Sequence, residues 1–218
     1  MNSDLLLLDK IKYIEGYCPD LFSWEELANI INIRPLMTSK RVKLLDAKNR
    51  KFSWISAGWQ HDANCYPPSL IRQLLDEMVI YFTDMSRVTK KINDFATSIE
   101  DENRQQTDAH VYVCRNPELE HPFGAHFDFS HNIIVQCEGQ TNFKVWDKVK
   151  DITISNINMQ MDEEPLMDVV MKPGDAIWIP MHYPHHAISL TPRLSVSFPF
   201  TEEGSFEMSR EDRNWIEL

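Results

Sequence analysis

Three side chains in this 218-residue sequence are of the right types and spacing to hold one metal ion. His126 and Asp128 stand two positions apart, so in an extended chain they project from the same face. His185 follows a Pro-Gly-Asp turn, an apolar strand and an Ile-Pro step, after which a loop should present it at the mouth of a barrel. Two imidazoles and a carboxylate form a facial triad, which leaves positions open for a co-substrate and dioxygen on Fe(II). The pattern predicts an Fe(II) site made by these three residues.

The other histidines are expected to have different roles. His186 is the strand neighbour of His185, so its side chain should point away from the metal. His182 is expected in a loop, where it could face a substrate. The remaining four should be structural, namely His61, His110, His121 and His131.

The second half of the chain should supply the barrel that positions these ligands. Short apolar or alternating segments follow one another at close intervals, separated by turn residues such as Gly139 and Pro173-Gly174. Many short strands at this spacing predict a jelly roll, the double-stranded β-helix of cupins. The expected strands are His110–Cys114, Ile133–Gln136, Asn142–Trp146, Ile152–Ile157, Met167–Met171, Ala176–Ile179, His186–Leu190 and Leu194–Phe198.

The first half reads as mainly helical, which makes the whole an α+β fold with helices flanking the jelly-roll core. Ser23 and Glu26 form a capping box that should open a helix over Trp24–Ile31. The other expected helices are Leu5–Ile14, Leu70–Glu77 capped by Ser69, and Ser86–Asn103, with strands within 41–57 and at Met78–Phe82. We expect one domain over 1–218, with a flank at 1–107, the core at 108–200 and a short tail at 201–218.

From Asp108 to Phe198 the sequence resembles the Jumonji C-type, cupin-like oxygenases that use Fe(II) and 2-oxoglutarate, with a pattern similar to their asparaginyl hydroxylase branch. The resemblance is carried by His-Phe-Asp at 126–128, Asn132, Gln136 before Gly139, the segment at 173–181 and His-His-Ala-Ile-Ser-Leu at 185–190. It implies hydroxylation of a substrate carbon with dioxygen, coupled to conversion of 2-oxoglutarate to succinate. His126, Asp128 and His185 resemble the iron ligands of that family, and Asn132 resembles an amide that hydrogen-bonds the co-substrate or iron-bound water.

One position departs from that family. Its members usually carry Lys or Arg two residues after the glycine of the second core strand, to pair with the distal carboxylate of 2-oxoglutarate, and here that residue is Thr141. A buried carboxylate requires a cation or several donors. Arg193 shares strand parity with Ser195 and Ser197 and is expected to face inward, so we interpret Arg193 with the Thr141 hydroxyl as the clamp. Lys144 should face outward, since it lies at odd spacing from Thr141.

Two other classes of function stay open on these residues. Thr141 favours a metal-dependent cupin enzyme that does not use 2-oxoglutarate, and a degenerate barrel could be a non-catalytic binding module. The substrate could be a protein or peptide side chain, a free amino acid or another small molecule. Tyr112 is expected to line the pocket, and four tryptophans are expected in the core, namely Trp54, Trp59, Trp146 and Trp178.

Composition limits the partners and the compartment. The formal net charge is −11 and the isoelectric point is near 5.1, which makes nucleic acid an unfavourable partner. No apolar run reaches membrane-spanning length, and Leu5–Leu8 lacks the basic flank and cleavage site of a signal peptide. The four cysteines are scattered without a CxxC pair, as in a reduced cytoplasmic protein. The short tail predicts a monomer or weak homodimer.

Overall fold

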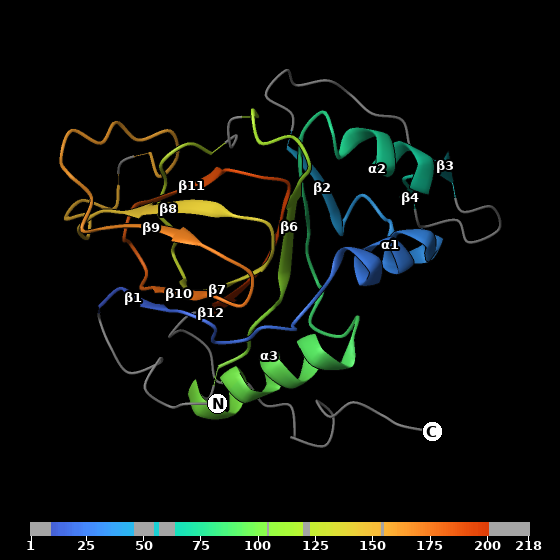
Figure 1. The fold of residues 1–218 in the computed structure, drawn as a ribbon, viewed down its shortest axis with the longest axis horizontal. Coiled ribbons are helices and arrows are strands. Elements are labelled where there is room, and N and C mark those ends of the chain that lie inside the picture. The colour runs from blue at the N-terminus through green and yellow to red at the C-terminus, as the bar shows by residue number, and fades with distance from the viewer. Residues whose placement is uncertain are drawn as a thin grey trace.

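Two antiparallel sheets face each other in the computed structural model (Figure 1), which describes residues 10–45, 55–56, 64–103, 105–119, 123–153 and 155–200. The larger sheet has the strand order β1 (Lys12–Ile14), β10 (Ala176–Ile179), β7 (His131–Glu138), β12 (Arg193–Phe200), β6 (His110–Cys114), β5 (Val79–Phe82) and β2 (Val42–Leu45). The smaller sheet has the order β11 (His185–Ser189), β8 (Thr141–Val145) and β9 (Met167–Met171), and β3 (Ile55–Ser56) pairs with β4 (Asn64–Cys65). This arrangement confirms the predicted jelly-roll core.

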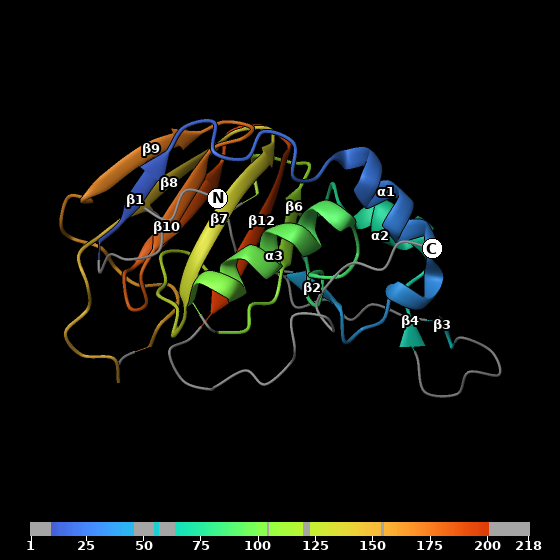
Figure 2. The same ribbon diagram turned by 90° about the horizontal axis from the view of Figure 1, so that it is seen from below.

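The helices lie beside and beneath the larger sheet, as predicted for the amino-terminal flank. α1 (Trp24–Asn32) and α2 (Pro68–Leu74) lie beyond β6, and α3 (Lys90–Asn103) runs across the outer face of the sheet (Figures 1 and 2). A 3-10 turn, η2, covers Arg34–Leu36. The predicted capping box is present, because Glu26 N donates to Ser23 Oγ and Ser23 N donates to the Glu26 carboxylate. Among the described residues, none of the helices has the length and apolar character needed to span a bilayer.

The larger sheet buries both faces, and side-chain alternation separates them. Along β12, Leu194, Val196 and Phe198 point outward into the main core beneath the helices. The alternate residues Arg193, Ser195 and Ser197 point inward between the sheets. A period of two in a strand produces this division, since successive side chains take opposite faces.

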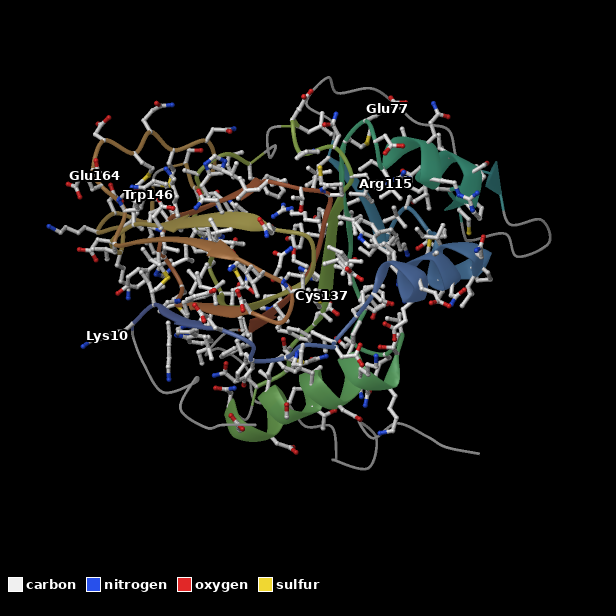
Figure 3. All side chains as sticks on the ribbon, in the orientation of Figure 1. Lys10, Glu77, Arg115, Cys137, Trp146 and Glu164 are labelled. Carbon is white, nitrogen blue, oxygen red and sulfur yellow. The ribbon has the colours of Figure 1, made fainter. Side chains whose placement is uncertain are left out.

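A second, smaller core lies between the two sheets at the end away from α1 and α2. It contains Phe143 and Val145 of β8 with Ile177 and Ile179 of β10. Trp146 closes this end of β8 (Figure 3), and its Nε1 donates to the carbonyl oxygen of Glu163 at 2.8 Å. Trp146 and Trp178 are buried as predicted, whereas Trp54 and Trp59 lie outside the described residues.

Two sequence predictions are wrong because tertiary partners decided the local structure. The described residues of Ile152–Ile157 form no strand. Ile152 and Ile157 are each 44% exposed, and Asn156 instead bonds to the segment that carries His126. The helix expected over Leu5–Ile14 is wrong in its last turn, where residues 12–14 are β1, paired to β10. The start of that expected helix, 1–9, lies outside the described residues.

Two helix boundaries also differ from the prediction. α2 begins at Pro68 with Pro67 as its N-cap, so Ser69 is not the cap; proline is favoured here because the first helical turn does not need its N–H. α3 begins at Lys90 and not at Ser86. Ser86 Oγ is used elsewhere, accepting from Ala109 N at 2.8 Å, and Thr89 Oγ1 accepts from Ile92 N at the helix start.

Asp175 fastens the edge strand β1 to the turn before β10. Its buried carboxylate accepts hydrogen bonds from the Tyr13 hydroxyl at 2.6 Å, Gly16 N at 2.9 Å and Lys172 N at 2.8 Å. Burial by itself would raise the pKa of Asp175, but these donors outweigh it and the pKa is lowered. Burial and the Asp175 contact both raise the pKa of Tyr13.

We therefore expect Asp175→Asn to lower the free energy of unfolding by about 1–3 kcal/mol at pH 7, because an amide cannot accept through both of its ends. The folded-state pKa lies below the unfolded one, so the contribution is complete above the unfolded value of about 4 and is lost as pH falls through the folded value. Urea unfolding of both proteins from pH 7 to pH 2.5 tests this, with Asp94→Asn, in an exposed pair with Lys90, as the control. Equal stabilities of wild type and Asp175→Asn at pH 7 would contradict the assignment.

Candidate metal centre

A short backbone pairing brings together the two histidines that the sequence analysis selected. His126 N donates to His185 O at 3.0 Å and His185 N donates to His126 O at 2.7 Å, so the two residues are direct antiparallel partners. Side chains of directly opposed residues leave the same face, and the two imidazole centroids lie 4.4 Å apart. Asp128 lies two positions from His126 on that same face. His185 thus joins His126 and Asp128 in one cluster, although it lies 57 positions or more after them in sequence.

The backbone orients both imidazole rings. His126 Nδ1 lies 3.0 Å from the carbonyl oxygen of Gly124, and His185 Nδ1 lies 3.1 Å from the carbonyl oxygen of Tyr183. A carbonyl oxygen only accepts, so each Nδ1 must carry the proton in these contacts. In a neutral ring with this tautomer, Nε2 carries no proton and is left as the ligand atom.

The carboxylate completes a set of three donors. One ligand atom from each of His126, Asp128 and His185 lies within 4.8 Å of the others, and His185 Nε2 is 3.7 Å from Asp128 Oδ2. Asn132 Nδ2 also donates to Asp128 Oδ2, at 3.3 Å. Two imidazoles and one carboxylate on one face form the ligand set of mononuclear non-haem iron sites.

Desolvation keeps His126 neutral. Burial, reinforced by the neighbouring His185, lowers the pKa of His126 to about 4. A neutral imidazole is the metal-binding form, so this environment favours coordination at neutral pH.

The donors stand on the wall of a pocket between the two sheets. Its polar residues beyond the donors are Tyr112, Asn132, Arg193, Ser195 and Ser197, and its apolar residues are Phe123, Ile134, Phe143 and Ala187. Arg193 is 2% exposed, and its Nε has no hydrogen-bond partner among the described residues. Burial lowers the pKa of Arg193, which reflects a guanidinium cation held away from water.

The other residues considered from the sequence fall on both sides of the barrel wall. Lys144 lies on the outer face of β8, where its Nζ is 3.6 Å from Asp168 Oδ2. Thr141 is fully buried on the opposite face, outside the group that lines the pocket, and its Oγ1 has no partner in the described part of the chain. His182 sits in a loop with φ of 68°, and its ring lies edge-on to Phe127 and Phe129. His131 stacks on Trp178, 5.4 Å between centroids, which is the structural role expected for it.

Two contacts within the pocket were not predicted from the sequence. Ser197 bonds directly to Asn132, and Phe123 lies edge-on to the ring of His126 at 5.5 Å. The parity of β12 placed Ser197 inward but could not indicate its partner, since that depends on the register between β12 and β7. No sequence pattern places Phe123 in the pocket, because it lies in the loop before the segment that carries His126.

Comparison with known proteins gives a consistent family. A family model described as the JmjC domain matches residues 82–208. The bifunctional lysine-specific demethylase and histidyl-hydroxylase NO66 of Drosophila persimilis is 23% identical over 131 residues, which is 59% of this chain and 19% of that protein. Ribosomal oxygenase 1 of Danio rerio is 34% identical over 84 residues, which is 35% of this chain and 15% of that protein. The chain thus spans about a fifth or less of the length of these curated relatives.

Solved structures show the same fold. YcfD, a ribosomal oxygenase from Escherichia coli determined in complex with cobalt and 2-oxoglutarate, superposes with a TM-score of 0.60 at 17% identity. The superposition covers 94% of this chain and 53% of that one.

We expect Mn(II) affinity to depend on all three donors. Replacing His126, Asp128 or His185 by alanine removes one of three protein ligands and should weaken binding by about 100-fold or more, beyond the 10- to 100-fold typical of outer-shell partners. His182→Ala and His186→Ala should bind Mn(II) nearly as wild type does. Calorimetric titration of each variant with Mn(II) measures this. Loss of binding in His186→Ala with retention in His185→Ala would show that the third ligand is displaced by one residue.

Proposed function

The chain belongs to the JmjC domain family, and on that premise we propose that it is an Fe(II)- and 2-oxoglutarate-dependent oxygenase. In this proposal His126, Asp128 and His185 hold the iron and Arg193 holds the distal carboxylate of 2-oxoglutarate. The chain covers only part of the length of its relatives, so the proposal rests on the residues of the pocket.

The donor set fits iron in its chemistry. Two neutral imidazoles and one carboxylate contribute a single negative charge, which leaves a bound Fe(II) with net positive charge to attract an anionic co-substrate. Each imidazole is already turned by its own backbone carbonyl, so binding requires little ring rotation.

The buried guanidinium of Arg193 is the observation that supports 2-oxoglutarate as the co-substrate. A cation that is 2% exposed requires an anion or several acceptors, and the Nε of Arg193 has neither among the described residues. A dicarboxylate spanning from the donors to Arg193 would neutralise both ends of the pocket. The Thr141 hydroxyl, expected from the sequence to share the clamp, is also buried without a partner among the described residues, but Thr141 does not line the pocket and the clamp is proposed for Arg193 alone.

When bound, iron and 2-oxoglutarate supply an oxidant that puts one oxygen atom of dioxygen into a substrate C–H bond and the other into succinate, with loss of carbon dioxide. The chain's own residues bind and orient. Arg193 would hold the co-substrate at the deep end, while Ile134 and Phe143 exclude water from the space between the sheets.

For the substrate we propose a protein side chain, with a small molecule as the other outcome. Relatives whose names state a histidyl-hydroxylase or a ribosomal oxygenase support a protein substrate. On the chain itself, Phe129 follows directly after Asp128 and is 54% exposed, which supplies an apolar contact for a polypeptide next to the donors.

Turnover of 2-oxoglutarate tests the function. The purified chain with Fe(II) should convert 2-oxoglutarate to succinate with matching dioxygen uptake, and Asp128→Ala should abolish this. Dioxygen uptake without succinate would indicate the cupin enzyme that does not use 2-oxoglutarate. Tight Mn(II) binding with neither product would indicate a binding module.

Arg193→Ala should raise the 2-oxoglutarate concentration needed for half-maximal turnover by roughly 30- to several-thousand-fold, because truncating one partner of a buried charge pair typically costs about 2–5 kcal/mol. Arg193→Lys should recover part of this, since a point charge lacks the fork geometry. Mn(II) affinity should stay near that of wild type in both.

Lys144→Ala is the matched control for this prediction. Lys144 lies on the outer face of β8 beside Asp168, so its loss should leave the 2-oxoglutarate requirement unchanged. A large defect in Lys144→Ala with little effect in Arg193→Ala would overturn the clamp.

A further inference from the structure

We infer that Ser197 is a positioning residue that acts through Asn132 on the metal-ligating carboxylate of Asp128. Asn132 then serves the iron ligand, and this differs from the role toward co-substrate or iron-bound water that the family resemblance implies. The inference rests on the proposed metal site but not on turnover.

Two hydrogen bonds connect the three residues. Ser197 Oγ donates to Asn132 Oδ1 at 2.6 Å, and Asn132 Nδ2 donates to Asp128 Oδ2 at 3.3 Å. Ser197 is 3% exposed and Asn132 is 7% exposed, so water competes little for either group. The strand register produces the first contact: Asn132 pairs with Pro199 and Ile134 with Ser197, which makes Asn132 and Ser197 diagonal neighbours on the inner face.

The chemistry of the Asn132 amide fixes which of its ends faces Asp128 and which faces Ser197. A carboxylate only accepts, so the amide must turn its NH₂ toward Asp128 and its carbonyl oxygen toward Ser197. The Ser197 hydroxyl satisfies that buried oxygen and fixes the plane of the amide. Without the Ser197 hydroxyl, Asn132 Oδ1 would be a buried acceptor that has lost this hydrogen bond. The amide would then be free to rotate away from the Asp128 carboxylate.

The relay from Ser197 through Asn132 orients the carboxylate of Asp128, as backbone carbonyls orient the two imidazole rings. Each imidazole is turned by a carbonyl two residues earlier, whereas the side chain of Asp128 is 34% exposed and depends on Asn132. Asn132 holds the same oxygen, Oδ2, that lies 3.7 Å from His185 Nε2. All three donors are therefore oriented by a fixed group, and outer-shell partners of this kind typically contribute 10- to 100-fold in metal affinity.

The test is a double-mutant cycle read by Mn(II) titration of the full chain. Ser197→Ala should weaken Mn(II) binding by about 10-fold, and Asn132→Ala by at least as much. If Ser197 acts through Asn132, the double variant should bind no more weakly than Asn132→Ala. Ser197→Thr, which keeps the hydroxyl, should recover most of the affinity.

The control is Thr107→Val, which removes another buried hydroxyl that bonds to β12. Thr107 Oγ1 donates to Pro199 O at 2.8 Å, and Thr107 does not line the pocket, so its loss should affect stability but leave Mn(II) affinity unchanged. If Ser197→Ala does not fold, Ser197→Cys replaces it as a near-isosteric variant with a weak donor, and it should be weakened in the same direction.

Unchanged affinity in the Ser197 variants, or additive losses in the double variant, would overturn the inference while leaving the metal site intact. A wild-type chain that does not bind Mn(II) would overturn both the inference and the proposed function. Coupling in the cycle without 2-oxoglutarate turnover would support the relay and overturn the oxygenase.

Discussion

The reciprocal backbone pairing of His126 with His185 is the contact on which the site depends. It is an isolated bridge and not part of a longer ladder, yet it fixes the distance between two imidazoles that come from different parts of the barrel. The segment that carries His126 is also held on its other side, where Phe127 N donates to Asn156 O. Because main-chain atoms make these bonds, the ligand spacing does not depend on the packing of long side chains.

The second constraint is the double burial of the larger sheet. β12 places apolar side chains toward the helices and polar ones toward the interior, whereas β7 places Ile133 and Val135 toward the helices and both Asn132 and Ile134 toward the interior. Each strand thus serves a core and a site at once. The helices therefore do more than add stability. They cover the outer face, which leaves the inner face available for Arg193, Ser195 and Ser197 without loss of the main core.

Much of the site could be predicted because it depends on short-range periodicity. The i, i+2 spacing of His126 and Asp128 and the parity of Arg193 with Ser195 follow from the geometry of any strand, and the capping box before α1 is equally local. What could not be predicted depends on register and on distant partners. Ile152 and Ile157 look like strand residues but face solvent. Residues 12–14 become a strand because they pair with β10 and are held by Asp175. The bond of Ser197 to Asn132 requires the pairing of β12 with β7.

The local tethering of the two histidines has a consequence for how this scaffold could change. Each ring takes its orientation from a carbonyl two positions earlier in the same segment, so each ligand is a self-contained unit of three residues. Substitutions elsewhere in the barrel would shift such units as rigid pieces and would not rotate the rings within them. Residues in the walls of the pocket can thus be substituted to fit new substrates while the coordinating nitrogens keep their orientation.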